Sequence, residues 1–155
     1  ASTVLLSEVD EDRRNICKSV GADFTIDPNQ EKAMEEIKGH TDGGPDIVVE
    51  CVGSVATAEQ SVAMVKSGGT VVLFGVSPHG QTMQLSPYEI FRRDITIRGS
   101  FINPFTFRDA VRLIEQGKID FEPLTLQKFP LEKINEALAY QQSGSRMKTI
   151  IESNN

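Results

Sequence analysis

Glu8 is the first informative residue of the sequence, because a carboxylate here directly follows a short predicted strand, 4–6. In doubly wound α/β folds, a carboxylate at this point accepts hydrogen bonds from the two ribose hydroxyls of an adenosine. Glu8 would also repel a 2′-phosphate and so favours NAD over NADP, although Arg13 and Arg14 leave this open because arginine binds phosphate. The alternative is a solvated acid beside Asp10, the predicted cap of the next helix.

Two later strands end on glycine, in the segments 50–53 and 68–75. Glycine at the carboxyl end of a strand lets a flat ring or a phosphate approach the backbone closely. Ligands of open α/β sheets bind along this edge. Each glycine alone is more often part of a simple turn, but a series at successive strand ends indicates a ligand-binding edge.

No other kind of catalytic or metal site is indicated by the sequence. His40 lies in a glycine-rich loop and His79 in a turn, and neither has a cysteine or second histidine at ligand spacing. The Tyr-x-x-x-Lys pair of short-chain dehydrogenases is absent, because Tyr88 and Tyr140 are each followed four positions later by another residue type. We therefore predict no catalytic residues and no metal ligands in this sequence.

The candidate binding residues are expected to be positioned by strands and helices that alternate along the chain. Asp10 and the pair Ser86-Pro87 have the residue order of helix starts. Alternation of this kind predicts an α/β fold with a mostly parallel sheet covered by helices on both faces. The predicted strands are 4–6, 24–26, 46–52, 70–74, 95–98 and 148–151, and the predicted helices are 10–20, 32–38, 56–66, 87–93, 106–116 and 131–142.

Composition and charge exclude several classes of protein. Hydrophobic residues make up 39% and charged residues 25% of the 155 positions, as in soluble globular domains. The net charge of −6 argues against nucleic acid or an anionic membrane as partner, and no apolar run reaches the ~18 residues of a transmembrane helix. Cys17 and Cys51 form no C-x-x-C pair and lie in apolar runs, which predicts reduced, buried thiols in a cytoplasmic protein without a signal peptide.

Five segments together closely resemble the zinc-type medium-chain alcohol dehydrogenases, with matching order and spacing. A further segment, 90–101, is most similar to the polyol and threonine dehydrogenase branch. The resemblance implies an incomplete Rossmann-type doubly wound parallel sheet over 1–102 that binds NAD, and a C-terminal segment of helices and a strand, 103–155, that returns to the catalytic domain. The five segments are 4–14, 20–23, 46–53, 68–75 and 129–137.

The resemblance also implies cofactor-binding roles at the adenosine end of the dinucleotide. Glu8 matches the residue that binds the adenosine ribose, and Arg13 matches the basic residue that flanks this ribose. Lys148 matches a late basic residue that reaches the pyrophosphate; the alternative is a surface lysine near a strand.

Residues at the ends of three predicted strands match the family's remaining cofactor contacts. The stretch 51–53 matches residues beside the adenine and the nicotinamide ribose, whereas Phe74, Ser100 and Ile102 match positions whose backbone groups hold the nicotinamide carboxamide. The predicted residues of this group are Cys51, Val52, Gly53, Phe74, Gly75, Ser100, Phe101 and Ile102.

In the resembled family, the glycine-rich turn that binds the pyrophosphate, the zinc ligands and the proton relay all lie before the strand that leads to Glu8. No G-x-G-x-x-G precedes Glu8, so the resemblance implies a C-terminal fragment that is inactive alone, with zinc only in the missing part. The missing strand is the central one of the order 3-2-1-4-5-6. We therefore expect the isolated chain to close this gap, swap a strand or need a companion piece, and its final strand, 148–152, to lack its natural sheet.

Three interpretations of the function are open. The first is the NAD(H)-binding portion of a dehydrogenase that moves a hydride between NAD and a secondary alcohol, with a polyol favoured. The second is a non-catalytic nucleotide-binding or dimerisation module, because the edge strand 95–101 pairs with its twin in dimers of the resembled family, giving a homodimer or larger oligomer. The third, a methyltransferase-like fold, leaves 68–75 and 129–137 unexplained.

Overall fold

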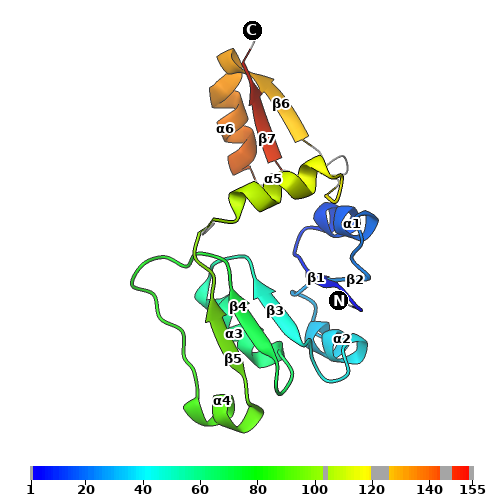
Figure 1. Ribbon diagram of the computed structural model, residues 1–155, viewed down its shortest axis with the longest axis vertical. Helices are drawn as coiled ribbons and strands as arrows, with labels where there is room; N and C mark the ends of the chain where they lie inside the picture. The colour runs from blue at the N-terminus through cyan, green and yellow to red at the C-terminus, as the bar shows by residue number, and fades with distance from the viewer. Residues whose placement is uncertain (1, 103–104, 120–125, 144–147, 154–155) are drawn as a thin grey trace. The chain divides into compact units, whose positions relative to one another are not determined.

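The computed structural model describes residues 2–102, 105–119, 126–143 and 148–153, in which helices alternate with strands (Figure 1). Every strand pair among these residues is parallel. The chain divides into two compact units, one made of Ala1–Pro28 and Asp109–Asn155 and the other of Asn29–Arg108. The alternation and the parallel pairing confirm the predicted α/β class.

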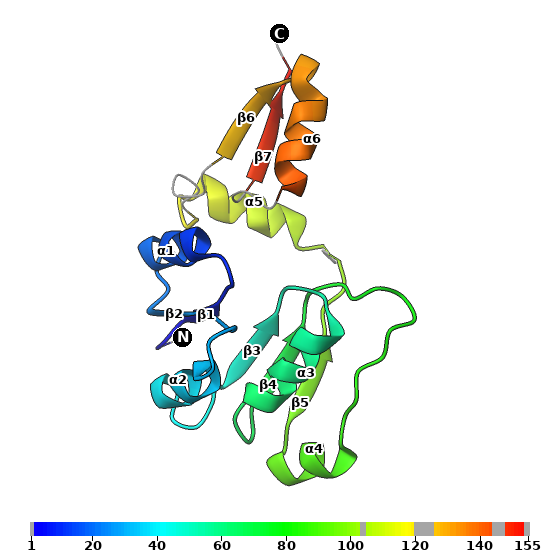
Figure 2. The same ribbon diagram turned by 180° about the vertical axis from the view of Figure 1, so that it is seen from behind.

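The first unit contains two small sheets, β1-β2 and β6-β7, and each has a helix packed against it (Figures 1 and 2). Helix α1 contacts β1 and β2, and helix α6 contacts β6 and β7. The elements are β1 Leu5–Ser7, α1 Glu11–Ser19, β2 Phe24–Ile26, β6 Leu126–Pro130, the 3-10 turn Leu131–Lys133, α6 Ile134–Gln142 and β7 Lys148–Glu152, with α5, Phe107–Glu115, beginning in the second unit.

Strand β6 was not predicted from the sequence. It pairs with β7 from Leu126↔Lys148 to Pro130↔Glu152. The rings of Phe129 in β6 and Tyr140 in α6 lie 5.6 Å apart, and Ala137 of α6 is buried. The final strand therefore has a parallel partner within its own chain, and the expectation that it lacks its natural sheet stays a prediction.

The second unit is built on the three-stranded sheet β3-β4-β5, with α3 over one of its faces (Figure 1). The register places Val48, Val71 and Ile97 side by side in the three strands. These side chains join one hydrophobic cluster that also contains Val65 after α3 and Ile95 before β5. The elements are α2 Ala33–His40, β3 Ile47–Glu50, α3 Val55–Met64, β4 Thr70–Leu73, α4 Pro87–Arg93 and β5 Thr96–Gly99.

The opposite face of β3 differs from the expectation of a sheet covered on both sides. Ile47 and Val49, which alternate with Val48, are 63% and 53% exposed. Successive side chains of a strand point to opposite faces, so burial of Val48 beneath α3 sends these two outward. The apolar run 46–52 resembles a strand buried on both faces, but α3 buries only one of them.

The strand orders β2-β1 and β3-β4-β5 correspond to the 3-2 and 4-5-6 parts of a doubly wound sheet. Strands β1 and β3 each stand at the end of their sheet. The predicted domain boundary at residue 102 stays a prediction. So does the expectation that the chain closes the gap of the central strand, swaps a strand or needs a companion piece.

Helix caps determine where the loops at the sheet edge begin. The side chain of Asp10 accepts the N–H of Arg13 at the start of α1, as the sequence predicted. The Ser54 hydroxyl likewise accepts the N–H of Thr57 at 3.1 Å, so α3 starts one residue earlier than predicted. The turn between β3 and α3 is therefore short and closed by its own side chains.

Candidate functional site

The carboxylate of Glu8 is fixed at the carboxyl end of β1. Glu8 N–H donates to the carbonyl oxygen of Ile26 at 3.0 Å and extends the pairing with β2 by one residue. Glu8 Oε1 accepts the N–H of Asp10 at 3.0 Å, and Oε2 lies 3.8 Å from Nη1 of Arg13. Because the Glu8 side chain is only 24% exposed, it is an oriented acid held beside Arg13 rather than a fully solvated one.

Arg14 holds the turn that carries Glu8. Its Nη1 donates to the carbonyl oxygens of Glu8 at 2.7 Å and Val9 at 2.8 Å, and lies 3.7 Å from Oδ2 of Asp27 after β2. The side chain is 16% exposed. The sequence suggested Arg14 as a possible phosphate ligand, whereas its guanidinium is used here to join the ends of β1 and β2.

Glu50, the last residue of β3, is a buried carboxylate whose contacts the sequence did not reveal. Its Oε1 accepts the N–H of Val52, the N–H of Gly53 and the hydroxyl of Thr57, each at 2.8 Å. The Thr57 hydroxyl also lies 2.7 Å from Oγ of Ser54, the cap of α3. Glu50 therefore joins the end of β3, the following turn and the first turn of α3 in one hydrogen-bond network.

The backbones of Gly53 and Gly75 are in close contact where β3 and β4 end. A Cβ on Gly75 would collide with the backbone nitrogen of Gly53 and lie 2.7 Å from its Cα, and a Cβ on Gly53 would lie 2.6 Å from the carbonyl oxygen of Val76. Gly53 also has a φ of +80°, which favours glycine. The N–H groups of Phe74 and Gly75 both donate to the carbonyl oxygen of Glu50. Glycine is therefore required at both positions to bring the two loops together.

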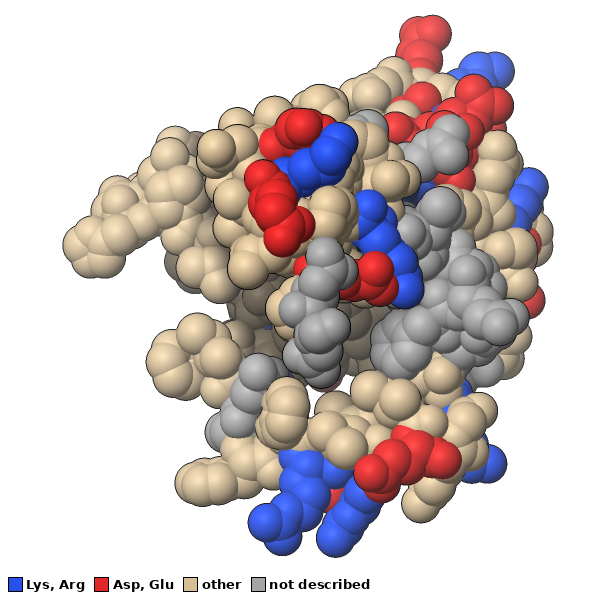
Figure 3. All heavy atoms as spheres, turned by 90° about the horizontal axis from the view of Figure 1, so that it is seen from above, with Lys and Arg blue, Asp and Glu red and all other residues tan. Residues whose placement is uncertain are grey.

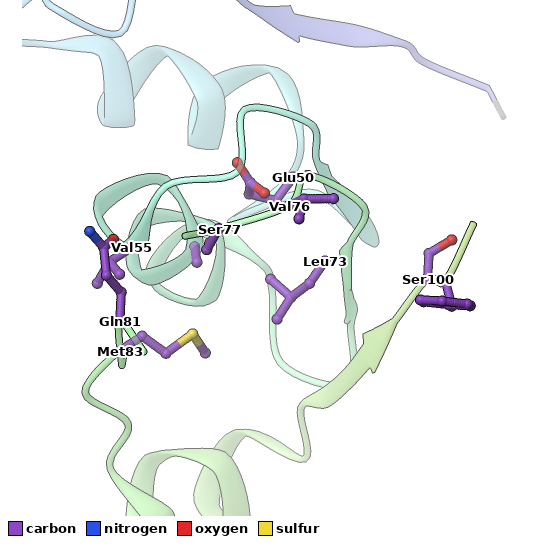
Figure 4. A pocket seen from close by; sticks show the side chains of 11 residues that line it. Glu50, Val55, Leu73, Val76, Ser77, Gln81, Met83 and Ser100 are labelled. Atoms are coloured by element: carbon purple, nitrogen blue, oxygen red, sulfur yellow. The ribbon is translucent and has the colours of Figure 1, made fainter. Parts of the chain in front are cut away.

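A cavity of about 370 Å³ opens beside this junction in the second unit (Figure 4). It contains three of the predicted residues, Gly75, Ser100 and Phe101, with Glu50 at one wall. Ser100 follows β5, and its N–H donates to the carbonyl oxygen of Leu73 at 3.0 Å. The remaining lining is mostly apolar and comes from α3, β4 and the loop after β4: Val55, Ala58, Leu73, Val76, Ser77, Gln81 and Met83.

The predicted site residues thus fall into separate groups. Glu8 and Arg13 lie together in the first unit, and Cys51 to Gly53 lie with Phe74 and Gly75 in the second. The side chains of Val52, Phe74, Phe101 and Ile102 are exposed. Lys148 is an exposed residue at the start of β7 in the first unit, where it pairs with Leu126 of β6.

The two cysteines differ in burial from the prediction. Cys17 is half-buried and Cys51 is exposed, and both are unbridged. Although the Cys51 residue is exposed, protein atoms around its sulfur displace part of the water and so raise the pKa of the thiol, and the nearby Glu50 carboxylate raises it further. The pKa of Cys17 is raised in the same way, by burial and then by Glu8. Both shifts disfavour the thiolate, which is the nucleophilic form of cysteine.

Charged side chains of both signs are interspersed on the face of the molecule shown in Figure 3. Exposed ion pairs along the chain follow the same pattern and include Glu89–Arg92, Asp109–Arg112, Lys128–Glu152 and Lys133–Glu136. This face carries mixed charge rather than an extended basic patch.

A family model described as zinc-binding dehydrogenase matches residues 1–116. The chain belongs to the zinc-binding dehydrogenase family. Among curated relatives of this zinc-binding dehydrogenase chain, sorbitol dehydrogenase of Gallus gallus is 32% identical and L-threonine 3-dehydrogenase of Pyrococcus furiosus 31% identical, each over 154 residues. The matches cover 97% of this chain but only 43% and 44% of those relatives, so the chain spans less than half of their length. The predicted family and branch are confirmed.

Solved zinc-binding dehydrogenases share the fold of the chain. A structure described as a zinc-binding dehydrogenase from Sinorhizobium meliloti 1021, bound to NADP, is 34% identical with a TM-score of 0.89 over 97% of this chain and 45% of that one. Benzyl alcohol dehydrogenase from Acinetobacter calcoaceticus is 28% identical with a TM-score of 0.88 over 99% of this chain and 43% of that one. The chain is therefore a portion of the dinucleotide-binding type of domain found in these enzymes.

A resident zinc ion, which the family name implies, does not fit the side chains at hand. Within the described ranges, no three His, Cys, Asp or Glu residues come together as a metal site would require.

None of the helices in the same ranges combines the length and the apolar character needed to cross a membrane.

Proposed function

We propose that this chain forms the NAD(H)-holding part of a zinc-type dehydrogenase that oxidises a secondary alcohol, with a polyol favoured. The contact between the Gly53 and Gly75 backbones carries the proposal, because it brings the ends of β3 and β4 close together at the edge where α/β sheets bind ligands. The sorbitol and threonine dehydrogenases among the relatives support the substrate class. When bound, the nicotinamide ring would supply the hydride acceptor, and the chain's residues would orient it.

Glu8 would select NAD over NADP. Its oriented carboxylate can accept two ribose hydroxyl hydrogen bonds and would repel a 2′-phosphate. The guanidinium of Arg14 donates to the main-chain oxygens of Glu8 and Val9. Arg13 is therefore the basic side chain beside the Glu8 carboxylate that could contact a 2′-phosphate. The Sinorhizobium meliloti relative was solved with NADP, so the two cofactors need a direct comparison.

Phe74 and Ser100 would orient the nicotinamide through their carbonyl oxygens. Their N–H groups already donate to the carbonyl oxygens of Glu50 and Leu73. Only acceptors therefore remain at these two backbone positions, and a carboxamide NH₂ group offers two donors. Ile102 would complete this set, and Lys148 would approach the pyrophosphate.

Titration of the purified chain with NADH and NADPH, followed by fluorescence, tests the proposal. We expect saturable NADH binding, weaker NADPH binding, and a loss of at least about tenfold in NADH affinity for Glu8→Ala, because hydrogen bonds to a charged group contribute ~1.5–3 kcal/mol. Glu11→Ala, which removes an exposed acid three residues away, is the matched control and should bind like the unmodified chain. Failure of a folded chain to bind NADH would refute the proposal. We expect no alcohol oxidation by this chain alone.

A second candidate function, assembly of two copies, is supported by the position of β5 at the end of its sheet. Thr96 and Ser100 donate to β4, so the alternating pattern points the N–H groups of Ile97 and Gly99 away from β4. An unpaired edge of this kind can pair with its twin. Sedimentation should show a dimer that Gly99→Pro dissociates; a monomer at all concentrations would exclude this function.

A further inference from the structure

Glu50 is a buried carboxylate that the proposed cofactor contacts do not use. Its side chain is 5% exposed, and among the described residues only Ser61 is another polar residue buried to this degree. Burial of a carboxylate is costly unless hydrogen bonds compensate for the lost water. The groups that provide this compensation reveal what Glu50 holds in place.

The compensating donors belong to the turn after β3 and to the start of α3. The N–H groups of Val52 and Gly53 and the hydroxyl of Thr57 converge on a single oxygen, Glu50 Oε1. Hydrogen bonds to a carboxylate are roughly twice as strong as those between neutral groups. The position of the turn 51–53 is therefore fixed by hydrogen bonds to one side chain rather than by strand pairing.

The second carboxylate oxygen faces the loop after β4. A Cβ on Gly75 would lie 2.6 Å from Glu50 Oε2, so this oxygen is directed at the Gly75 backbone. The main-chain oxygen of Glu50 accepts from Phe74 and Gly75 as well. Figure 4 shows Glu50 and Val76 at one wall of the cavity. Glu50 thus contacts both loops that meet at the Gly53–Gly75 junction.

We infer that Glu50 is a positioning residue that sets the spacing of these two loops for the nicotinamide end of the cofactor, an inference that rests on the proposed function. Because all three donors meet at one oxygen, the length of the side chain should matter more for the position of the turn than its charge. Glutamine keeps an oxygen at the same distance from the three donors, whereas aspartate keeps the charge but is one methylene shorter and cannot reach all three. The affinity for NADH should therefore decrease in the order Glu, Gln, Asp.

The test compares NADH with ADP, which lacks the nicotinamide half, on the full chain. We expect Glu50→Gln to weaken NADH binding about threefold and Glu50→Asp at least about tenfold. ADP should be weakened by a smaller factor in both variants, because it can meet only the adenine side of the turn 51–53. The matched control is Glu59→Gln, the same substitution at a half-buried carboxylate of α3 that accepts the N–H of Gln84. It should leave both affinities unchanged.

Several outcomes would overturn the inference. A purely structural role would weaken NADH and ADP by equal factors, and an absent role would leave Asp and Gln equivalent to the unmodified chain. Lack of NADH binding by the unmodified chain would instead refute the proposed function itself. Should the Glu50 variants not fold, hydrogen exchange on the unmodified chain decides: the amides of Val52 and Gly53 should exchange more slowly than those of the loop 79–83, and equal rates would overturn the inference.

Discussion

Alanine at Gly75 tests the junction of β3 and β4 through a single added methyl group. Its Cβ would lie 2.7 Å from Gly53 Cα and 2.6 Å from Glu50 Oε2, whereas ordinary contacts begin near 3.4 Å. The turn 51–53 would therefore need to retreat by at least roughly 0.7 Å, and further at the Gly53 nitrogen, against the hydrogen bonds that Glu50 makes to it. Backbone atoms cannot rotate away as a side chain can, so the conflict must separate the two loops.

The expected cost follows from sterics alone, because Gly75 does not have a positive φ. Overpacking of this kind costs about 1–3 kcal/mol in the free energy of unfolding. For a chain of about this length, 1 kcal/mol lowers the melting temperature by roughly 2–4 °C. We expect Gly75→Ala to melt about 2–12 °C lower than the unmodified chain, and to bind NADH more weakly.

Thermal unfolding followed by circular dichroism measures this change. The matched control is Gly99→Ala, because Gly99 also lacks a positive φ and has no atom within 4 Å of the position of a Cβ. That substitution should be neutral or stabilise the chain by up to about 1 kcal/mol through the unfolded state. If Gly75→Ala melted within a degree of the control, the contact between the two glycine backbones would not constrain the site.

Three further predictions concern other features of the fold. Ser54→Ala removes the cap of α3 and should lower the urea stability by about 1 kcal/mol. The hydrogen bond from Lys66 lowers the pKa of the Asp46 carboxyl group. The ionised carboxylate therefore stabilises the fold above the ordinary carboxyl pKa, and this stabilisation is lost as the pH falls through the lowered pKa. Asp46→Asn should reduce the difference in melting temperature between pH 7 and pH 3. Desolvation raises the pKa of the Cys51 thiol. In a Cys17→Ser variant at pH 8, the rate at which iodoacetamide alkylates Cys51 should therefore be lower than the rate at which it alkylates the thiol of free glutathione.

The parts of the fold that local sequence determines were predictable. The β-branched runs over 46–52 and 70–74 gave β3 and β4 within a few residues, because both strands are short and bounded by glycine or proline. Asp10 and Ser86 cap the helices they precede, since each has a side-chain oxygen within reach of the third following N–H. Glu8 was identified from its place after a strand, although its cofactor role stays a prediction.

The parts that depend on distant partners were not predictable. Strand β6 contains Lys128 and ends at Pro130, so its sequence resembles a loop until β7 provides a partner. Cys51 lies in an apolar run, but the end of the strand turns its side chain to solvent. Glu50 lies in the same run, and its importance becomes visible only when the donors around its carboxylate are located.

The two halves of the candidate site are each built mainly from neighbours in sequence, which has a consequence for binding. Glu8 is oriented by Asp10 and held by Arg14, and Glu50 by residues no more than seven positions away. Each half can therefore be preorganised within its own unit. We expect NADH to bind more tightly than ADP, because ADP lacks the nicotinamide half for which the Gly53–Gly75 junction is proposed. Equal affinities for NADH and ADP would mean that only the Glu8 half binds.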